Sequence, residues 1–115
     1  MRESRPDHYV LDAIADDVED VAAIMRMLNS DSVIGWHHTW GRQFDRNEVV
    51  EALSRLVKAD LARVSVLSGD AKGLVELLPK QLPPGHYDDA WFAMTPQGRL
   101  VHTNWHPDGG RGAPE

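Results

Sequence analysis

The sequence predicts a single α+β domain in which three helices precede two to three antiparallel strands and a short C-terminal helix. Three observations favour this fold class. Apolar residues recur at helical spacing in the first half of the chain, then switch to strict alternation after Asp60, and a second apolar strand pattern ends at Thr95-Pro96. At 115 residues the chain is long enough to build one hydrophobic core.

Two helices are expected before residue 30. The first is short and is expected to be capped by Asp7. The second is expected over residues 17–28, because Asp16 and Glu19 have the spacing of a capping box in front of an apolar stripe. The following stretch, Val33 to Trp40, fits a short strand and an ordered loop equally well.

The third helix is expected over residues 45–59. Asp45 and Glu48 repeat the capping-box spacing, and the residues that follow carry an apolar stripe that includes Val49 and Leu53. This helix must end near Asp60, because the alternating pattern of a strand begins directly afterwards.

The first long strand is expected to place Ala62, Val64 and Val66 on one face and Arg63 and Ser65 on the other. Next come an expected turn at Gly69-Asp70, a stretch "KGLVELL" that is compatible with a further strand, and a loop rich in proline and glycine. The strand "WFAM" then ends at a Thr-Pro pair, where the threonine can cap a helix that the proline begins.

The domain is expected to occupy residues 8–105. Residues 1–7 are interpreted as a flexible N-terminus, and residues 106–115 as a disordered tail with too little apolar content to order itself.

This order of elements is the outline of a winged helix, and two motifs strengthen the interpretation. The stretch "DRNEVVEALSRLVKADLARV" followed by "AWFAMTPQGRLV" resembles bacterial winged helix-turn-helix regulators of the MarR and PadR kind. The resemblance implies that the third helix is a recognition helix, that the excursion between the strands is the wing, and that the protein regulates transcription by binding double-stranded DNA as a homodimer. The chain departs from this pattern in having Asp60 instead of glycine, a long link before the third helix, and no long flanking helix for dimerisation.

If the third helix enters a major groove, polar residues on its N-terminal turns and outer face reach bases and phosphates, and cations of the wing touch the backbone. These predicted DNA-binding residues are Arg42, Gln43, Arg46, Asn47, Arg55, Lys58, Arg63 and Lys72. The alternative is a solvated helix face in which Glu51 pairs with Arg55.

The net charge of −6 gives no uniformly basic footprint for nucleic acid. A second hypothesis is therefore a winged-helix module that binds a protein partner through the segment around Trp36 and Trp40, and a third is a ligand sensor at the same tryptophans. Against both stands the interpretation that these two indoles pack inside the helical layer.

No catalytic or phosphate-binding motif is found, so neither enzymatic activity nor a cofactor is expected. His102 and His106 have helical spacing but lack the context of a metal site, and no metal is expected. The chain has no cysteine, hence no disulfide. It also has no apolar run of about 18 residues and no signal-peptide pattern, so a cytoplasmic location without a membrane partner is expected.

Overall fold

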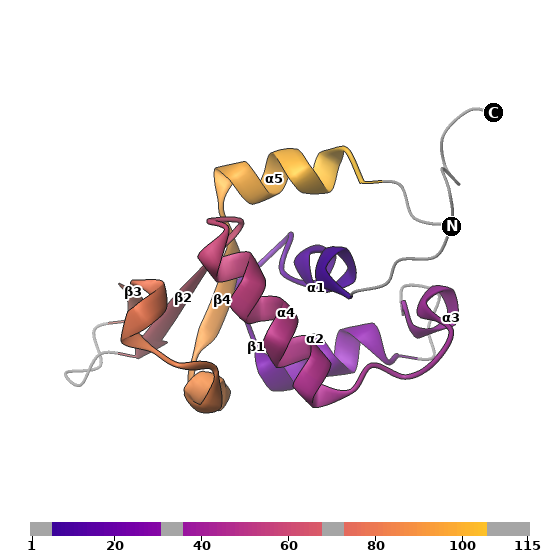
Figure 1. Cartoon of the computed structure of the whole chain (residues 1–115), viewed down its shortest axis with the longest axis horizontal. Coiled ribbons are helices and arrows are strands. Elements are labelled where there is room, and N and C mark those ends of the chain that lie inside the picture. Colours follow the sequence, from indigo (N-terminus) through magenta and orange to yellow (C-terminus); the bar gives the residue numbers. More distant parts are fainter. Residues whose placement is uncertain (1–5, 31–35, 68–72, 106–115) are drawn as a thin grey trace.

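The computed structural model describes residues 6–30, 36–67 and 73–105 of the chain. Within these ranges the protein is α+β, with five helices, two short 3-10 helices and one four-stranded antiparallel sheet (Figure 1). The elements in chain order are α1 (Asp7–Ala13), β1 (Glu19–Asp20), α2 (Val21–Leu28), α3 (His37–Trp40), α4 (Arg46–Lys58), β2 (Ala62–Leu67), β3 (Leu74–Leu77), η1 (Pro79–Gln81), η2 (Pro84–Asp89), β4 (Trp91–Met94) and α5 (Pro96–Thr103).

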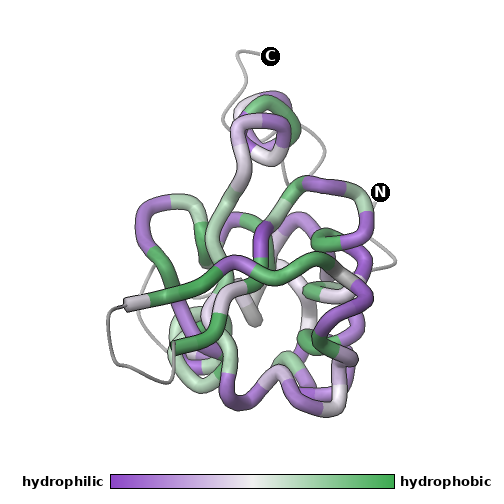
Figure 2. Tube along the Cα trace, turned by 90° about the vertical axis from the view of Figure 1, so that its left-hand side faces the viewer, coloured by the Kyte–Doolittle hydropathy of each residue, from purple (hydrophilic) through white to green (hydrophobic). Residues whose placement is uncertain are grey.

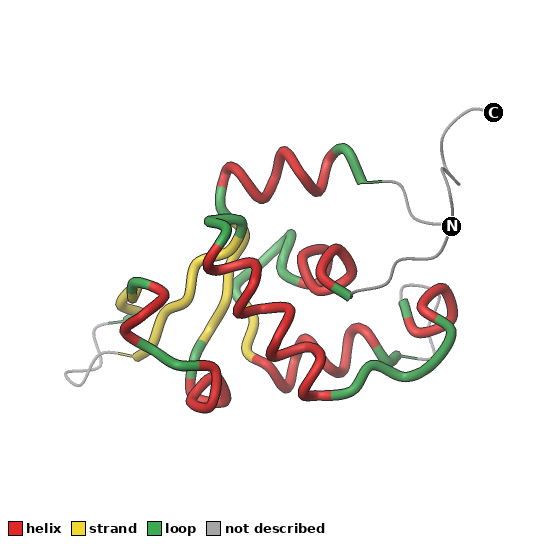
Figure 3. The backbone as a smooth tube through the Cα atoms, in the orientation of Figure 1, coloured by secondary structure: helices red, strands yellow, loops and turns green. Residues whose placement is uncertain are grey.

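The strands and the two 3-10 helices gather at one end of the molecule, and α2 and α3 extend toward the other (Figure 3). Their order in the sheet is β1-β4-β2-β3, so β4 returns to lie between β1 and β2, while β3 lies at an edge. Val64 of β2 and Phe92 of β4 are opposite each other in the register and are both fully buried. Their side chains therefore define the inner face of the sheet, and the residues that alternate with them define the outer face.

Helices α1, α2 and α4 contact one another, and Tyr9 of α1 lies at the centre of the aromatic core between them. Its ring centroid is 5.6 Å from that of Trp36, 5.7 Å from those of Trp40 and Phe44, and 5.2 Å from that of Trp105. The interpretation that Trp36 and Trp40 pack into the helical layer is thus confirmed.

The start of the second helix was predicted wrongly. α2 begins at Val21, and its cap is Asp20, whose carboxylate accepts a hydrogen bond of 2.9 Å from the Ala23 N–H. Glu19 and Asp20 instead pair with β4, and this pairing excludes the capping box expected from Asp16 and Glu19. The cap expected from Asp7 is also wrong, because Asp7 is the first residue of α1 and its carboxylate binds Arg55.

The stretch expected to be a strand or a loop contains the short helix α3, and residues 31–35 lie outside the described ranges. The further strand is confirmed as β3, whereas the expected loop after it is built mainly of η1 and η2. Here Tyr87 packs edge-on against Phe92 at a centroid distance of 4.9 Å. The expected turn at Gly69-Asp70, most of the N-terminus and the tail lie outside the described residues.

The Thr-Pro-x-Gly-Arg motif joins α5 to the turn between α4 and β2. The Thr95 hydroxyl donates a hydrogen bond of 2.6 Å to the carbonyl of Asp60 and accepts one of 2.9 Å from the Gly98 N–H, which confirms the predicted cap. Asp60 has a positive φ of 63°, a left-handed conformation that aspartate adopts more readily than most residues. Arg99 donates to the carbonyl of Ala15 at 2.7 Å and thereby ties α5 to the end of α1.

Candidate functional site

The predicted DNA-binding surface centres on α4, which contacts the helices α1 and α2 and also β2, η1 and η2. The helix is buried at seven positions, and one of these is the polar residue Ser54. Ser54 forms a hydrogen bond with the hydroxyl of Tyr87 in η2. Burial is the main reason that the pKa of this Tyr87 hydroxyl is raised. The excursion between the strands therefore covers part of α4, and the exposed stripe of the helix is narrow.

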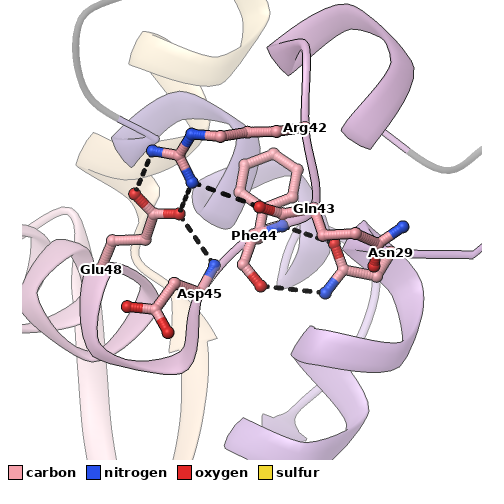
Figure 4. A network of polar contacts seen from close by, with 6 residues as sticks. All are labelled: Asn29, Arg42, Gln43, Phe44, Asp45 and Glu48. Carbon is pink, nitrogen blue, oxygen red and sulfur yellow. Dashed lines mark hydrogen bonds and ion pairs between the residues drawn. The ribbon is translucent and has the colours of Figure 1, made fainter.

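At the N-terminal end of α4, Arg42 is bound by an acidic partner (Figure 4). Its guanidinium donates two hydrogen bonds to the carboxylate of Glu48, at 2.6 and 2.8 Å, and a third to the carbonyl of Gln43. Glu48 also accepts a hydrogen bond from the Asp45 N–H at 2.8 Å, which is one half of the predicted capping box. The Arg42 guanidinium lowers the pKa of Glu48, so this pair is ionised at neutral pH.

A second hydrogen-bonded pair in Figure 4 fixes the chain that leads into α4. The side-chain amide of Asn29, the residue after α2, donates to the carbonyl of Phe44 and accepts from its N–H, at 3.1 and 2.7 Å. This reciprocal contact fixes Phe44 beside the end of α2, and Arg42, two residues before Phe44, lies next to the first turn of α4.

Two further predicted arginines are paired with carboxylates that are distant in sequence. Arg46 forms an ion pair with Asp88 of η2. Arg55 donates two hydrogen bonds to Asp7 of α1, at 2.7 and 2.9 Å, instead of pairing with Glu51 as the alternative interpretation expected. Each acidic partner raises the pKa of its arginine through the hydrogen bond between them. The positive charge of these arginines is therefore compensated within the fold.

Gln43, Asn47, Lys58 and Arg63 are exposed, while Lys72 lies outside the described residues. They do not form one patch. Lys58 is at the far end of α4 from Asn47, a separation of about 16 Å at the helical rise per residue, and Arg63 points to the outer face of the sheet. Between residues 42 and 60 the chain has four Lys/Arg and four Asp/Glu, and the fold adds Asp7 and Asp88.

The strands β2 and β3 carry a feature that the sequence pattern did not single out. Leu67, Leu74, Val75 and Leu78 are exposed at 59%, 42%, 46% and 61%. Figure 2 faces this end of the molecule and shows a mostly hydrophobic strand pair beside the undescribed link. The signal was present in "GLVELL", where apolar residues do not alternate with polar ones as they do in a strand with one solvated face.

Sequence reasoning also missed a contact that joins three segments of the helical layer. The carboxylate of Asp12 in α1 accepts a hydrogen bond from the Trp36 indole N–H at 2.6 Å, and its other oxygen lies 2.7 Å from Nε2 of His102 in α5. His102 thus contacts a carboxylate, and His106, its expected helical neighbour, lies outside the described residues. Among the described residues, no three His, Asp or Glu side chains are placed to hold a metal ion.

None of the described helices is both long and apolar enough to cross a membrane. A scan against protein-family models and searches of curated proteins and solved structures find no match to this chain. The resemblance to bacterial regulators is therefore carried by the two sequence motifs alone.

Proposed function

We propose that the chain is a winged-helix domain that acts as a protein-interaction module. The strand order supports the winged-helix part of this proposal, because β4 inserts between β1 and β2 after a long excursion, and α4, which contacts α1 and α2, also contacts β2. In that arrangement β2, β3 and the segment leading to β4 take the place of the wing.

The observation that carries the interaction module is a contrast between two surfaces. Around α4, Arg42, Arg46 and Arg55 each bind a carboxylate, so the helix offers little uncompensated positive charge for phosphates. Neutralisation of phosphates supplies essentially all of the non-specific affinity for DNA. The wing, by contrast, exposes a contiguous pair of leucines, Leu67 and Leu74, which lie opposite each other in the β2–β3 register. Large apolar side chains exposed together are typical of protein contacts.

The experiment offers protein and DNA to the same immobilised chain. A nuclease-treated lysate of cells that express the chain naturally and a pool of random duplex DNA at about 50 mM salt are passed over separate columns, beside an immobilised acidic protein of similar size as control. The proposal expects a specific protein to be retained and the duplex to flow through. Retention of the duplex with no specific protein, and with affinity that falls steeply as salt rises, would contradict it.

A DNA-binding transcriptional regulator is the second candidate, and one observation favours it. Arg42, Gln43, Arg46 and Asn47 are all exposed at the N-terminal end of α4, which is the part of a recognition helix that reaches base edges. Exposed ion pairs contribute only about 0–1 kcal/mol, so the two arginines can exchange a carboxylate for a phosphate at little cost. This candidate expects duplex retention that is lost in the Arg46→Ala and Asn47→Ala variants and unchanged in Gln97→Ala, an exposed position of α5.

A further inference from the structure

A groove with an acidic rim lies at the end of the sheet where β2 ends and η2 leads into β4. It has a volume of about 430 Å³ and is lined by Asp20, Val66, Leu67, Asp88, Asp89 and Trp91. Its apolar part comes from Val66, Leu67 and the half-buried Trp91, and the rest of the described lining consists of three aspartates. No described cation lines it, although Arg46 pairs with Asp88 from outside.

The register of the sheet connects this groove to the exposed leucines of the wing. Asp20 lies opposite Trp91, Trp91 opposite Ser65, and Ser65 opposite Glu76, so these four side chains form one row across the outer face. Leu67 and Leu74 form the adjoining pair on the same face, two residues further along each strand. The surface thus combines an apolar strip with carboxylates at both ends of the neighbouring row.

We propose that this groove docks a peptide segment of a protein partner in which Lys or Arg side chains flank bulky apolar ones. The apolar side chains of the segment cover Leu67, Leu74 and the Trp91 indole, and its cations lie against Asp89 and Glu76. The proposal rests on the interaction function above and adds the location of the site and the chemistry of the partner. Charge complementarity selects this occupant, because a second copy of the chain would bring a net charge of −6 to a rim that is already acidic.

The carboxylates are not equally available to a partner. One oxygen of Asp20 accepts the capping hydrogen bond from Ala23, and Asp88 is paired with Arg46. Asp89 and Glu76 are exposed, and among the described residues none forms a hydrogen bond or ion pair with the side-chain carboxylate of either. The two are therefore the positions at which reversal of charge tests the proposal with least disturbance of the fold.

The test uses a displayed library of random dodecapeptides as the probe and selects it against the full chain. Parallel selections use a Leu67→Ser/Leu74→Ser double variant, an Asp89→Lys variant and a Leu100→Ser control. Leu100 is exposed at 60%, like Leu67, but lies on α5 away from the groove. Circular dichroism and thermal unfolding verify that each variant is folded before selection.

The proposal expects the wild-type chain to enrich peptides that combine basic and bulky apolar residues. Their affinity should fall at least about tenfold, equivalent to about 1.4 kcal/mol, in the double variant and in Asp89→Lys, and should be unchanged in Leu100→Ser. Enriched peptides that bind the double variant as tightly as wild type would refute the groove as the binding site but would still support the interaction function. Failure to enrich any peptide, together with retention of duplex DNA, would overturn both. Self-association of the chain that the double variant abolishes would show that a second copy occupies the groove, and would also overturn the proposal.

Discussion

Replacement of Gly98 by alanine tests how closely α5 approaches the turn between α4 and β2. A Cβ atom at residue 98 would lie 2.0 Å from the carbonyl oxygen of Leu61 and 3.1 Å from Cγ of Met94. Real Cβ atoms essentially never approach another atom within 3.0 Å, and here the obstacle is backbone that cannot rotate away. The helix must therefore move away from the turn. This movement should weaken the two hydrogen bonds that Thr95 donates, one to Asp60 at 2.6 Å and one to Leu61 at 3.1 Å.

The expected loss of stability is about 2–4 kcal/mol. Overpacking of this kind costs about 1–3 kcal/mol, and each weakened hydrogen bond adds about 1 kcal/mol. Alanine returns about 1 kcal/mol through its higher helix propensity. A domain of this size should then unfold roughly 10–20 °C lower.

The assay is thermal and urea unfolding followed by circular dichroism on wild type, Gly98→Ala and a Gly85→Ala control. No atom lies within 4 Å of a Cβ placed on Gly85 in η2, so that change should alter stability by no more than about 0.5 kcal/mol. A Gly98→Ala protein as stable as wild type, or more stable through helix propensity, would refute the close approach of α5 to the turn.

Three further predictions concern polar contacts. Asp7→Asn should lower the free energy of unfolding by about 1 kcal/mol at low salt and by less at high salt, because it removes the charged partner of Arg55 at a half-exposed site; a double-mutant cycle with Arg55→Met measures the coupling. The pKa of Glu19 is raised first by burial and then by neighbouring aspartates, so the ionised side chain opposes folding. The protonated side chain therefore contributes stability at low pH, and this contribution is lost as pH rises through the folded pKa. Glu19→Gln should therefore raise stability at pH 7 and reduce the gain that wild type shows on acidification, as urea unfolding across a pH series will report. Trp36→Phe removes the indole N–H that donates to Asp12 and should cost about 1–2 kcal/mol in urea unfolding, and a variant as stable as wild type would contradict a role for that bond.

The parts of the fold that were predicted correctly are those whose signals are local. The predicted bounds of α4 differ from the observed ones by one residue at each end, because the capping spacing of Asp45 and Glu48 agrees with a long apolar stripe. The sequence also predicts Thr95 as a helix cap, because a threonine directly before a proline is typical of the start of a helix. In both cases the neighbouring residues in sequence determine the structure.

The errors arise where tertiary contacts override a local pattern. Asp16 and Glu19 have capping-box spacing, but Glu19 forms part of β1 beside β4, which no pattern near residue 19 reveals. The proline and glycine residues of η2 predict a loop, whereas the structure has helical turns there, and Tyr87 of these turns packs on Phe92.

The candidate site also combines one contact between residues near in sequence with contacts between distant segments. The pairing of Arg42 with Glu48 spans six residues, whereas Arg46 meets Asp88 and Arg55 meets Asp7 only because the chain brings distant segments together. A charge count along α4 could not identify those partners.

We propose that the chain recognises a protein through β2 and β3 and does not bind DNA through α4. The most direct measurement is a pair of binding titrations on the purified chain at about 50 mM salt, one with a fluorescent random duplex and one with a fluorescent peptide taken from the selection. We expect saturable binding of the peptide, weakened in the Leu67→Ser/Leu74→Ser variant, and no rise in duplex anisotropy. Binding of the duplex that Arg46→Ala weakens, with no loss of peptide affinity in the wing variant, would contradict it.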